Sequence, residues 1–435
     1  MARYPSPKNH LTQRMLFALA SAGFGLVLLL WFVPQWQVNQ LPTLDRARLQ
    51  QLPLTDQLQL QLEETYHRAQ AEKEQRNTLI LIALGLWGGM AIYFSWQNYH
   101  SQRRQQDTSE FRKAVELLAA KDKIEVRLGG IYLLEQIASD SPGQQAIVLE
   151  VLTAYIREHS TKVGDTRHLG SNEVNTLRVP TDIQAALTVI ARSHSQFETS
   201  HLDFQDAYLI QANLIQANFQ GANFQGTYLI GTNLREADLR EANLRNADLL
   251  SANLSGADLT QANLSSANLL GTNLNSANFQ NADLTGANLR GAYLGNANLL
   301  EANLNSADLI GVYLSDANLS QAKLIGANLR TAKLIGTQLT NTDLSEANFT
   351  GADLSDASLV GADFTDANLR EVSFQRTQFR EANLSGADLR GAIFLEVEQL
   401  VECKLCRTKL PEHLDLDANR DCASLKIADQ SVASQ

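Results

Sequence analysis

The sequence ANLSG-ADLTQ-ANLSS-ANLLG at residues 252–271 contains four copies of one five-residue unit. Leu or Phe occupies every fifth residue from Phe204 to Phe394, which makes 39 consecutive positions without an exception. Two residues before each of them, from Ala207 to Ala392, stands Ala, Thr or Val. A period this strict over nearly half of the chain predicts a solenoid, in which short repeats stack on their neighbours.

The five-residue period fits neither an α-helix nor a straight strand. Five helical residues advance about 500°, so successive leucines would lie about 140° apart. In a straight strand the odd spacing would send alternate leucines to opposite faces. The chain must therefore turn a corner in every unit. Leu or Phe and the small residue before it then point inward, and the Asn or Asp between them points outward.

These units resemble the pentapeptide-repeat family over residues 202–397. The resemblance implies a right-handed quadrilateral β-helix with four units per coil, so that residues twenty apart become vertical neighbours. At about 4.8 Å per layer, such a solenoid would have about ten coils and a length of roughly 45 Å. The predicted fold class is an all-β right-handed quadrilateral β-helix, assigned to 199–397, preceded by a two-helix transmembrane hairpin and a small α-helical module.

Residues 1–106 have the composition of a membrane anchor. Two uncharged segments, 15–33 and 79–96, are nineteen and eighteen residues long, which is enough to cross about 30 Å of hydrocarbon. A cleaved signal peptide is the alternative for the first segment, but no small-residue cleavage site follows it, which favours an uncleaved anchor. The loop between them, 34–78, is leucine-rich and permits either a short amphipathic helix or a polar connector.

The charged flanks predict the orientation of this anchor. Residues 1–14 and 97–106 contain basic residues and no acid. Because Lys and Arg are enriched on the cytoplasmic side of membrane spans, both termini and the repeat domain are expected in the cytoplasm. We expect a multi-pass integral protein of the bacterial inner membrane.

Residues 107–198 predict that α-helical module, which would also cap the first coil. The segments 141–144 and 181–184 have the form of capping boxes and would each open a helix. The apolar residues at helical spacing before them are Leu128, Ile131, Leu134 and Ile137. The stretches 125–132 and 182–188 resemble a module that often precedes the repeats in membrane-anchored bacterial family members, and this resemblance implies no activity.

Residues 398–435 predict a C-terminal cap and tail that contain all the cysteines: Cys403, Cys406 and Cys422. Together with His413 they make four potential zinc ligands, but their spacing matches no common zinc module. The run 405–411 with Asp421 and Cys422 resembles a terminal motif of pentapeptide-repeat proteins in which two cysteines can pair. The resemblance therefore implies a Cys406–Cys422 disulfide.

Such a disulfide would suit an oxidising compartment and disagrees with the orientation predicted from the charges. The charge bias is the stronger argument, since a reduced pair held close together is compatible with either side of the membrane.

The sequence contains no catalytic or cofactor-binding motif. It has no Walker loop, no Gly-x-Ser-x-Gly, no His-Glu-x-x-His and no dinucleotide fingerprint. The nearest histidine pair, His159 and His168, falls at a helix end and in a polar loop, which is typical of solvated surface. We therefore predict no enzymatic activity, no catalytic residue, no cofactor and no metal ion.

Charge offers a second hypothesis. Residues 202–397 contain 21 acids and 11 bases, which account for most of the net charge of −11. Some soluble pentapeptide-repeat proteins mimic DNA with such a rod and bind topoisomerases. Four acids would stack in two pairs on one side, and they are Asp343, Glu346, Asp363 and Asp366. However, arginines interrupt every side, which favours solubilising charge and no nucleic-acid partner.

The most specific candidate contact surface is one vertical file of outward residues. Residues twenty apart stack in one file, and this file contains four aliphatic side chains, with two tyrosines beside them and arginines further along. The residues are Tyr208, Ile210, Tyr228, Ile230, Leu250, Leu270, Arg290, Arg330, Arg370 and Arg390. Exposed apolar patches mark contact surfaces, and Tyr and Arg dominate such contacts. Alternatively, the preceding helical segment folds back over the file, or the tyrosines only stiffen the ladder.

Together these features predict a membrane-anchored, non-enzymatic scaffold or adaptor that presents a rigid β-helical surface to an unknown protein partner. The alternatives are a purely structural spacer without a specific partner and an acidic DNA mimic that regulates a nucleic-acid enzyme. The sequence assigns no oligomeric state.

Overall fold

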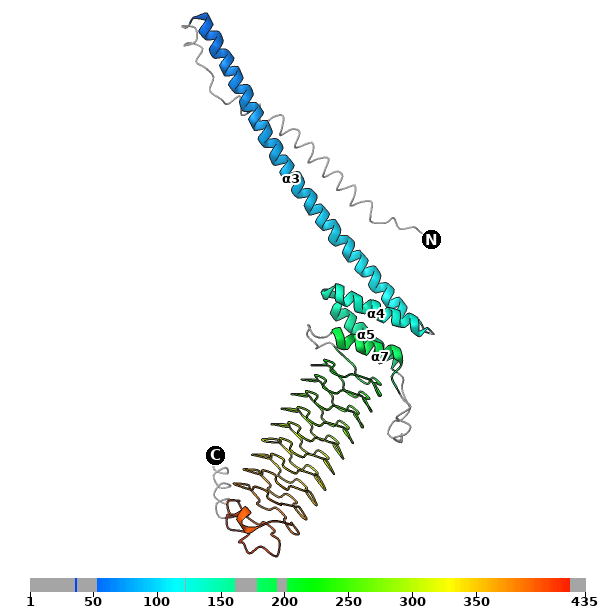
Figure 1. Ribbon diagram of the computed structural model, residues 1–435, viewed down its shortest axis with the longest axis vertical. Coiled ribbons are helices and arrows are strands. Elements are labelled where there is room, and N and C mark those ends of the chain that lie inside the picture. The colour runs from blue at the N-terminus through cyan, green and yellow to red at the C-terminus, as the bar shows by residue number, and fades with distance from the viewer. Residues whose placement is uncertain (1–35, 37–52, 122, 161–177, 194–201, 423–435) are drawn as a thin grey trace, which may run out of the picture. The chain divides into compact units, whose positions relative to one another are not determined.

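The computed structural model describes residues 36, 53–121, 123–160, 178–193 and 202–422. The chain divides into two compact units, Met1–Asp107 and Thr108–Gln435 (Figure 1). The first expected membrane span, 15–33, lies outside the described residues, and so does most of the expected loop before residue 53.

One long helix, α3 (Leu54–Leu118), runs through segments that the sequence pattern separates. It includes the later part of the expected loop 34–78, the whole apolar segment 79–96 and the polar residues after it, so from residue 54 onward the loop is helical, which is one of its two interpretations. The reason is local, because no Gly or Pro interrupts residues 54–84 and most of their side chains favour helix. By length and composition, the part Leu54–Gln97 is able to cross a membrane.

Three further α-helices pack together after α3. They are α4 (Ile124–Asp140), α5 (Gln145–His159), which follows the short 3-10 helix η1 (Pro142–Gln144), and α7 (Thr181–Ser193). The apolar spacing in α4 is confirmed, because Ile131, Leu134 and Ile137 are buried and Leu128 is half-buried. The end of α3 contributes Ala114 and Leu118 to the same core. A Cβ atom at Gly130 would lie 2.9 Å from the Ala114 carbonyl oxygen, so this glycine allows α4 to approach α3.

Helices begin at both predicted capping boxes, but the glutamine of the second box does not turn back to the start of its helix. At α5 the N-cap residue is Gln144, without a side-chain cap hydrogen bond, and its N–H donates to the Ser141 carbonyl oxygen at 2.8 Å. At α7 the side chain of Gln184 reaches the solenoid instead of the helix start. Its Oε1 accepts the Asn213 N–H and its Nε2 donates to the Asn213 carbonyl oxygen, both at 2.9 Å. The backbone of the first coil has no neighbouring coil on this side, so its N–H and carbonyl groups pair with the Gln184 side chain instead.

The solenoid is built from isolated parallel β-bridges rather than long strands. Each bridge from Asp203 to Ile393 joins residues twenty apart, for example Asn253 and Asn273. Four five-residue units therefore make one coil, as expected, and the coils stack into a rod (Figure 1). Along the ladder the Leu254 N–H donates to the Asn273 carbonyl oxygen at 2.7 Å. The inward Leu, Phe and Ala side chains form a continuous buried core.

Each corner of the coil depends on two local features. The residue two places after each inward Leu adopts a positive φ, as Ser251 (54°) and Gly256 (67°) do. The outward Asn or Asp accepts a hydrogen bond from the backbone two residues later, and Asn253 Oδ1 accepts the Ser255 N–H at 3.1 Å. Asn and Asp favour this local turn, which explains why they occupy the position between the two inward residues.

The helical module closes the first coil by supplying the hydrogen bonds of a missing neighbour. Ser160 Oγ accepts the Tyr208 N–H at 3.1 Å. The Val179 N–H donates to the Ile210 carbonyl oxygen at 3.1 Å. Together with the Gln184 amide, these groups pair backbone atoms that an open β-helix end would leave unpaired, so the module is the N-terminal cap.

At the other end the five-residue register stops one unit before the sequence pattern does. Phe394 is 61% exposed with a φ of 57°, and Leu395 takes the inward place at 2% exposure. The inward position expected for Phe394 is therefore wrong. The extra residue shifts the ladder, so that Asn383 pairs with Lys404, which is 21 residues further along. The 3-10 helix η4 (Val397–Leu400) follows this shift.

Candidate functional site: the outer surface of the solenoid

The four sides of the solenoid differ in charge. One of them, here called the acidic side, has seven acids and two bases among its outward and corner residues. The acids are Asp203, Asp206, Asp283, Asp343, Glu346, Asp363 and Asp366. Asp343 and Asp363 are vertical neighbours, and each carboxylate accepts hydrogen bonds from the backbone and hydroxyl of the residue two places later. The next side along the chain, here called the arginine side, has four acids and four bases.

The arginine side contains the file that the sequence predicts as a contact surface. Its ladder is confirmed at the tyrosines, because the rings of Tyr208 and Tyr228 stack with centroids 4.4 Å apart. The expected exposure is wrong for Ile210 and Ile230, which are 3% and 1% exposed. Val179, just before α7, lies next to Ile210, because its N–H donates to the Ile210 carbonyl oxygen at 3.1 Å.

Further along this side the predicted residues remain accessible. Leu250 is half-buried and Leu270 is 39% exposed. The four arginines follow in the same file, with Arg290 at 3.5 Å from Asp308 and Arg390 at 2.6 Å from Asp388. The other two, Arg330 and Arg370, are exposed and make no ion pair with any described residue. Whether this file binds a partner stays a prediction.

The side after the arginine side carries an exposed aromatic pair that the sequence reasoning missed. Tyr293 and Tyr313 are vertical neighbours whose rings stack at 5.0 Å with an interplanar angle of 8°. They are 47% and 46% exposed, in contrast to the half-buried Tyr208 and Tyr228. The spacing of twenty residues between two outward tyrosines was the available signal. The solenoid therefore presents an ordered, accessible aromatic surface near its middle.

A buried polar network joins three segments of the helical module. Arg127 Nε and the Tyr155 hydroxyl both donate to Asp182 Oδ2 at 2.6 Å, and the Asp182 side chain is 4% exposed. Burial opposes the charged carboxylate, but the hydrogen bonds from Tyr155 and Arg127 outweigh it and lower the pKa of Asp182. Burial and the bond to Asp182 raise the pKa of Tyr155. The two stretches that resemble a family module are thus fastened to each other, which is a structural role.

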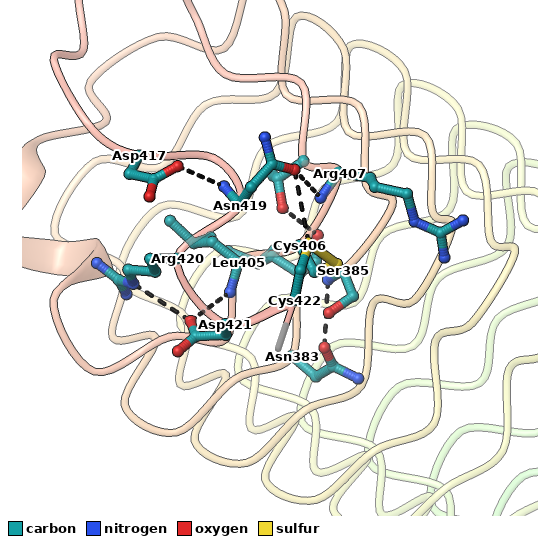
Figure 2. The surroundings of a disulfide bond; sticks show 12 residues. Asn383, Ser385, Leu405, Cys406, Arg407, Asp417, Asn419, Arg420, Asp421 and Cys422 are labelled. Atoms are coloured by element: carbon teal, nitrogen blue, oxygen red, sulfur yellow. Dashed lines mark hydrogen bonds and ion pairs between the residues drawn. A yellow bond between two sulfur atoms is a disulfide. The ribbon is translucent and has the colours of Figure 1, made fainter. Parts of the chain in front are cut away.

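The C-terminal cap contains a disulfide between Cys406 and Cys422, whose Cα atoms are 4.7 Å apart (Figure 2). The same tail is held by hydrogen bonds, because Asp421 Oδ2 accepts the Leu405 N–H at 2.9 Å and the Asp421 N–H donates to the Leu405 carbonyl oxygen at 3.0 Å. The tail therefore does not depend on the disulfide alone.

The potential zinc ligands are not brought together. Cys403 is buried, its thiol donates to the Phe379 carbonyl oxygen, and burial raises its pKa to about 12. His413 Nε2 lies 3.3 Å from the Leu395 carbonyl oxygen. No group of three or more metal-binding side chains occurs within the described residues. His159 stacks on Tyr155 at 4.3 Å, and His168 lies outside the described residues.

An open groove of about 850 Å³ lies between α7 and the first two coils. Its walls include Arg178, Arg192, Gln184 and Ile215. Two of these side chains take part in holding the module, because Gln184 pairs with Asn213 and Arg192 lies 3.5 Å from a carboxylate oxygen of Glu135. We therefore assign the groove to the cap.

Comparison with known proteins supports the assignment of the repeats. The family model for pentapeptide repeats matches in eight copies between residues 203 and 394. HetL, a pentapeptide repeat protein involved in heterocyst differentiation regulation in the cyanobacterium Nostoc sp. strain PCC 7120, is 30% identical, with 57% of this chain and 100% of HetL covered and a TM-score of 0.30.

Two other solved structures are similar to part of the chain. A pentapeptide repeat protein from the Arabidopsis thaliana thylakoid lumen is 26% identical over 27% of this chain and 80% of its own, with a TM-score of 0.20. The plasmid-mediated fluoroquinolone resistance protein QnrB1 is 18% identical over 50% of this chain and 96% of its own, with a TM-score of 0.27. No functionally curated protein matches the sequence.

The chain belongs to the pentapeptide-repeat family. Proteins of this family fold as right-handed β-helices, in agreement with the ladder of twenty-residue steps, and are generally non-catalytic structural or interaction proteins.

Proposed function

We propose that this chain is a membrane-anchored, non-enzymatic scaffold whose solenoid binds another protein. Two transmembrane segments, 15–33 and 79–96, would fix it in the bilayer. The second lies within α3, where large apolar side chains such as Leu81 and Ile92 are exposed, which a membrane would cover. The solenoid would then stand outside the bilayer as the binding part.

The observation that carries the binding role is the exposed stack of Tyr293 on Tyr313. Both rings are held by a ladder in which the Tyr313 N–H donates to the Ala292 carbonyl oxygen at 2.9 Å. Large aromatic groups that are already ordered lose little conformational entropy on binding, and tyrosine is a frequent interface residue. The accessible part of the arginine side, from Leu250 to Arg390, adjoins this stack and completes the proposed contact region.

We place the solenoid on the cytoplasmic side of a bacterial inner membrane, because the flanks 1–14 and 97–106 are basic. A Cys406–Cys422 disulfide favours the opposite, oxidising side. Labelling of sealed, right-side-out cells decides between them. If the solenoid is cytoplasmic, a C-terminal tag is not labelled in these cells, whereas a cysteine introduced by Gln50→Cys reacts with an impermeant thiol reagent. Labelling of the C-terminal tag would move the solenoid to the oxidising side.

One observation favours a second function, which is DNA mimicry. The acidic side stacks Asp343 on Asp363 and has seven acids against two bases. A mimic would bind a nucleic-acid enzyme with an affinity that falls steeply with salt. Asp343→Asn together with Asp363→Asn should weaken a partner that binds the acidic side and leave unchanged a partner that binds the tyrosines and the arginine side, so this pair of substitutions separates the two functions.

The direct test of the scaffold function is affinity capture from detergent-solubilised membranes. The full chain is compared with a variant that lacks residues 202–397, both carrying the same tag. A protein recovered with the full chain and absent from the variant supports the proposal. If both recover the same proteins, or neither recovers any, the solenoid is a structural spacer.

A further inference from the structure

The exposed tyrosines and the row of arginines belong to neighbouring sides of the solenoid, which meet at one corner. Arg290, Ile310 and Arg330 stand in one file of the arginine side, and the chain reaches Tyr293 and Tyr313 three residues after Arg290 and Ile310. The corner positions between them are Gly291 and Gly311. We call the surface formed by Arg290, Ile310, Arg330, Tyr293 and Tyr313 the tyrosine edge.

The glycines at this corner are not required by packing. Gly291 and Gly311 have φ values of 60° and 64°, but Asn, Asp, Ser and Glu adopt the same conformation at other corners. A Cβ atom at Gly291 would meet nothing within 4 Å, and one at Gly311 would lie 3.9 Å from Thr331. Their effect is therefore on the outer surface, where a missing side chain lets a neighbouring molecule contact the arginine file and the tyrosine rings together.

The arginines repeat at every second coil. Arg290, Arg330 and Arg370 are forty residues apart in sequence, so they lie about 9.6 Å apart along the rod at about 4.8 Å per layer. An α-helix advances about 10.5 Å in seven residues. A helix that lies along the rod would therefore bring a carboxylate to each arginine once per heptad, and the small mismatch is within the reach of a flexible arginine side chain.

The charges favour an acidic partner. Arg330 and Arg370 make no ion pair with any described residue, and the Arg290 to Asp308 distance of 3.5 Å belongs to an exposed, weak pair. Guanidinium groups are suited to carboxylates, which they bind through two parallel hydrogen bonds, and Arg290 is the arginine that lies across the corner from Tyr293. Ile310 and the two tyrosines would pack against apolar residues between the carboxylates.

An extended peptide fits this surface less well. In a strand, residues two apart are separated by about 7 Å, and residues three apart point to opposite faces, so neither spacing matches the arginines. Addition of a strand to the sheet is also disfavoured in the middle of the rod. There the backbone is already paired, because the Tyr293 N–H donates to the Thr272 carbonyl oxygen at 2.9 Å and the Tyr293 carbonyl oxygen accepts the Leu274 N–H at 2.7 Å.

We propose that the tyrosine edge binds an acidic amphipathic helix of another protein, lying along the rod with carboxylates seven residues apart. The proposal rests on the scaffold function and specifies its partner. A carboxylate would bind Arg290, a second would bind Arg330 and a third would bind Arg370, while apolar side chains between them contact Ile310, Tyr293 and Tyr313.

The test is site-specific photo-crosslinking in native membranes with the full chain. A photoreactive phenylalanine analogue replaces Tyr313, or Tyr293 in a second sample, and Gln280, on the side opposite the arginine side, serves as the control position. The attached peptide is then sequenced. We expect an adduct at the two tyrosine positions whose sequence has acids at seven-residue spacing within a helical apolar pattern. Arg330→Glu should lower its yield about tenfold or more, whereas Arg245→Glu on the acidic side should leave it unchanged.

Several outcomes would overturn the proposal. The first is an adduct to this chain itself, to a lipid or to a protein without that acidic spacing. The second is an equal adduct yield at Gln280 and at the tyrosines. The third is an adduct yield that Arg330→Glu does not change. Adducts at Gln280 without any at the tyrosines would overturn the tyrosine edge and leave the scaffold function standing. Adducts at none of the three positions would contradict both. Circular dichroism melting of each variant confirms that the rod is folded.

Discussion

The side-chain amide of Gln184 pairs with both main-chain polar groups of Asn213, accepting its N–H and donating to its carbonyl oxygen at 2.9 Å each. In every later coil the equivalent N–H bonds to the coil below, as the Asn233 N–H does to Ala212 at 2.9 Å. A glutamine side chain thus takes the place of a peptide group. The helical module is fitted to the first coil by this replacement rather than by apolar contact alone.

Changing this amide should loosen the first coil. Gln184→Glu removes the donor and places a carboxylate next to the Asn213 carbonyl oxygen, so we expect a loss of about 1–2 kcal/mol in the local stability of the first coil. Hydrogen exchange of the amides of residues 207–214 should accelerate by about tenfold. Gln280→Glu, which is on another side and far from the cap, should not change it. Equal exchange in both variants would show that the Gln184 pairing contributes nothing.

The buried network at Asp182 should make the helical module sensitive to acid. The folded-state pKa of Asp182 is lowered, so the folded state binds fewer protons than the unfolded state around that pKa. The stabilisation is complete above the ordinary pKa of about 4 and is lost as the pH falls through the lower, folded value. Exchange in α5 and α7 should therefore rise when the pH falls below about 4. Asp182→Asn should flatten this dependence.

Asp182→Asn should also destabilise the module at neutral pH. It leaves Arg127 without its carboxylate in a site where the Asp182 side chain is 4% exposed, and breaking such a pair costs about 3–5 kcal/mol. Asp388→Asn is the control, because its pair with Arg390 lies at the surface and exposed pairs contribute about 0–1 kcal/mol. Similar effects of the two substitutions on chemical denaturation would contradict the structural role of the network.

The inward register predicts a sharp contrast in the middle of the rod. Leu284 is fully buried, and Leu284→Asp would bury an unpaired carboxylate, at a cost of several kcal/mol. Gln280→Thr should remain within about ±0.5 kcal/mol, because Thr260 and Thr340 occupy the same file. Thermal unfolding followed by circular dichroism compares them. Comparable melting of the two variants would mean that the inward register is wrong.

The shift at the end of the repeats makes an opposite pair of predictions. Phe394 holds a left-handed conformation while exposed, so Phe394→Gly should stabilise the C-terminal cap by roughly 0.5–1 kcal/mol. Leu395→Ala should destabilise it by about 2–4 kcal/mol, because Leu395 is buried. Denaturant unfolding measures both. A large loss of stability from Phe394→Gly would show that Phe394 points inward after all.

The regular part of the fold was accessible from the sequence because its cause is local. Every five-residue unit repeats the same corner, the same inward pair and the same Asn or Asp turn, so one period determines both the core and the vertical neighbours. The stack of Tyr208 on Tyr228 follows directly from that arithmetic.

The failures occur where distant segments meet. Ile210 has the position of an exposed residue, but it is buried, and Val179 hydrogen-bonds to its backbone. Gln184 has the spacing of a capping residue, but an unpaired coil takes its side chain. Phe394 continues the period, but the cap inserts one residue into the ladder. The local sequence pattern predicts none of these three interactions, since each depends on tertiary contacts. The tyrosine edge is different, because its signal is local. Tyr293 and Tyr313 are twenty residues apart in the sequence, but a search for aliphatic files alone does not find them.

The central claim is that the first unit holds the chain in a membrane and the solenoid stands outside it. Alkaline carbonate extraction of native membranes, followed by detection of the chain in pellet and supernatant, tests this most directly. The full chain should stay in the pellet. A variant that begins at Thr108 should be released into the supernatant with an unchanged circular dichroism melt of the solenoid. Release of the full chain by carbonate would contradict the membrane anchor and with it the account of this protein as an anchored scaffold.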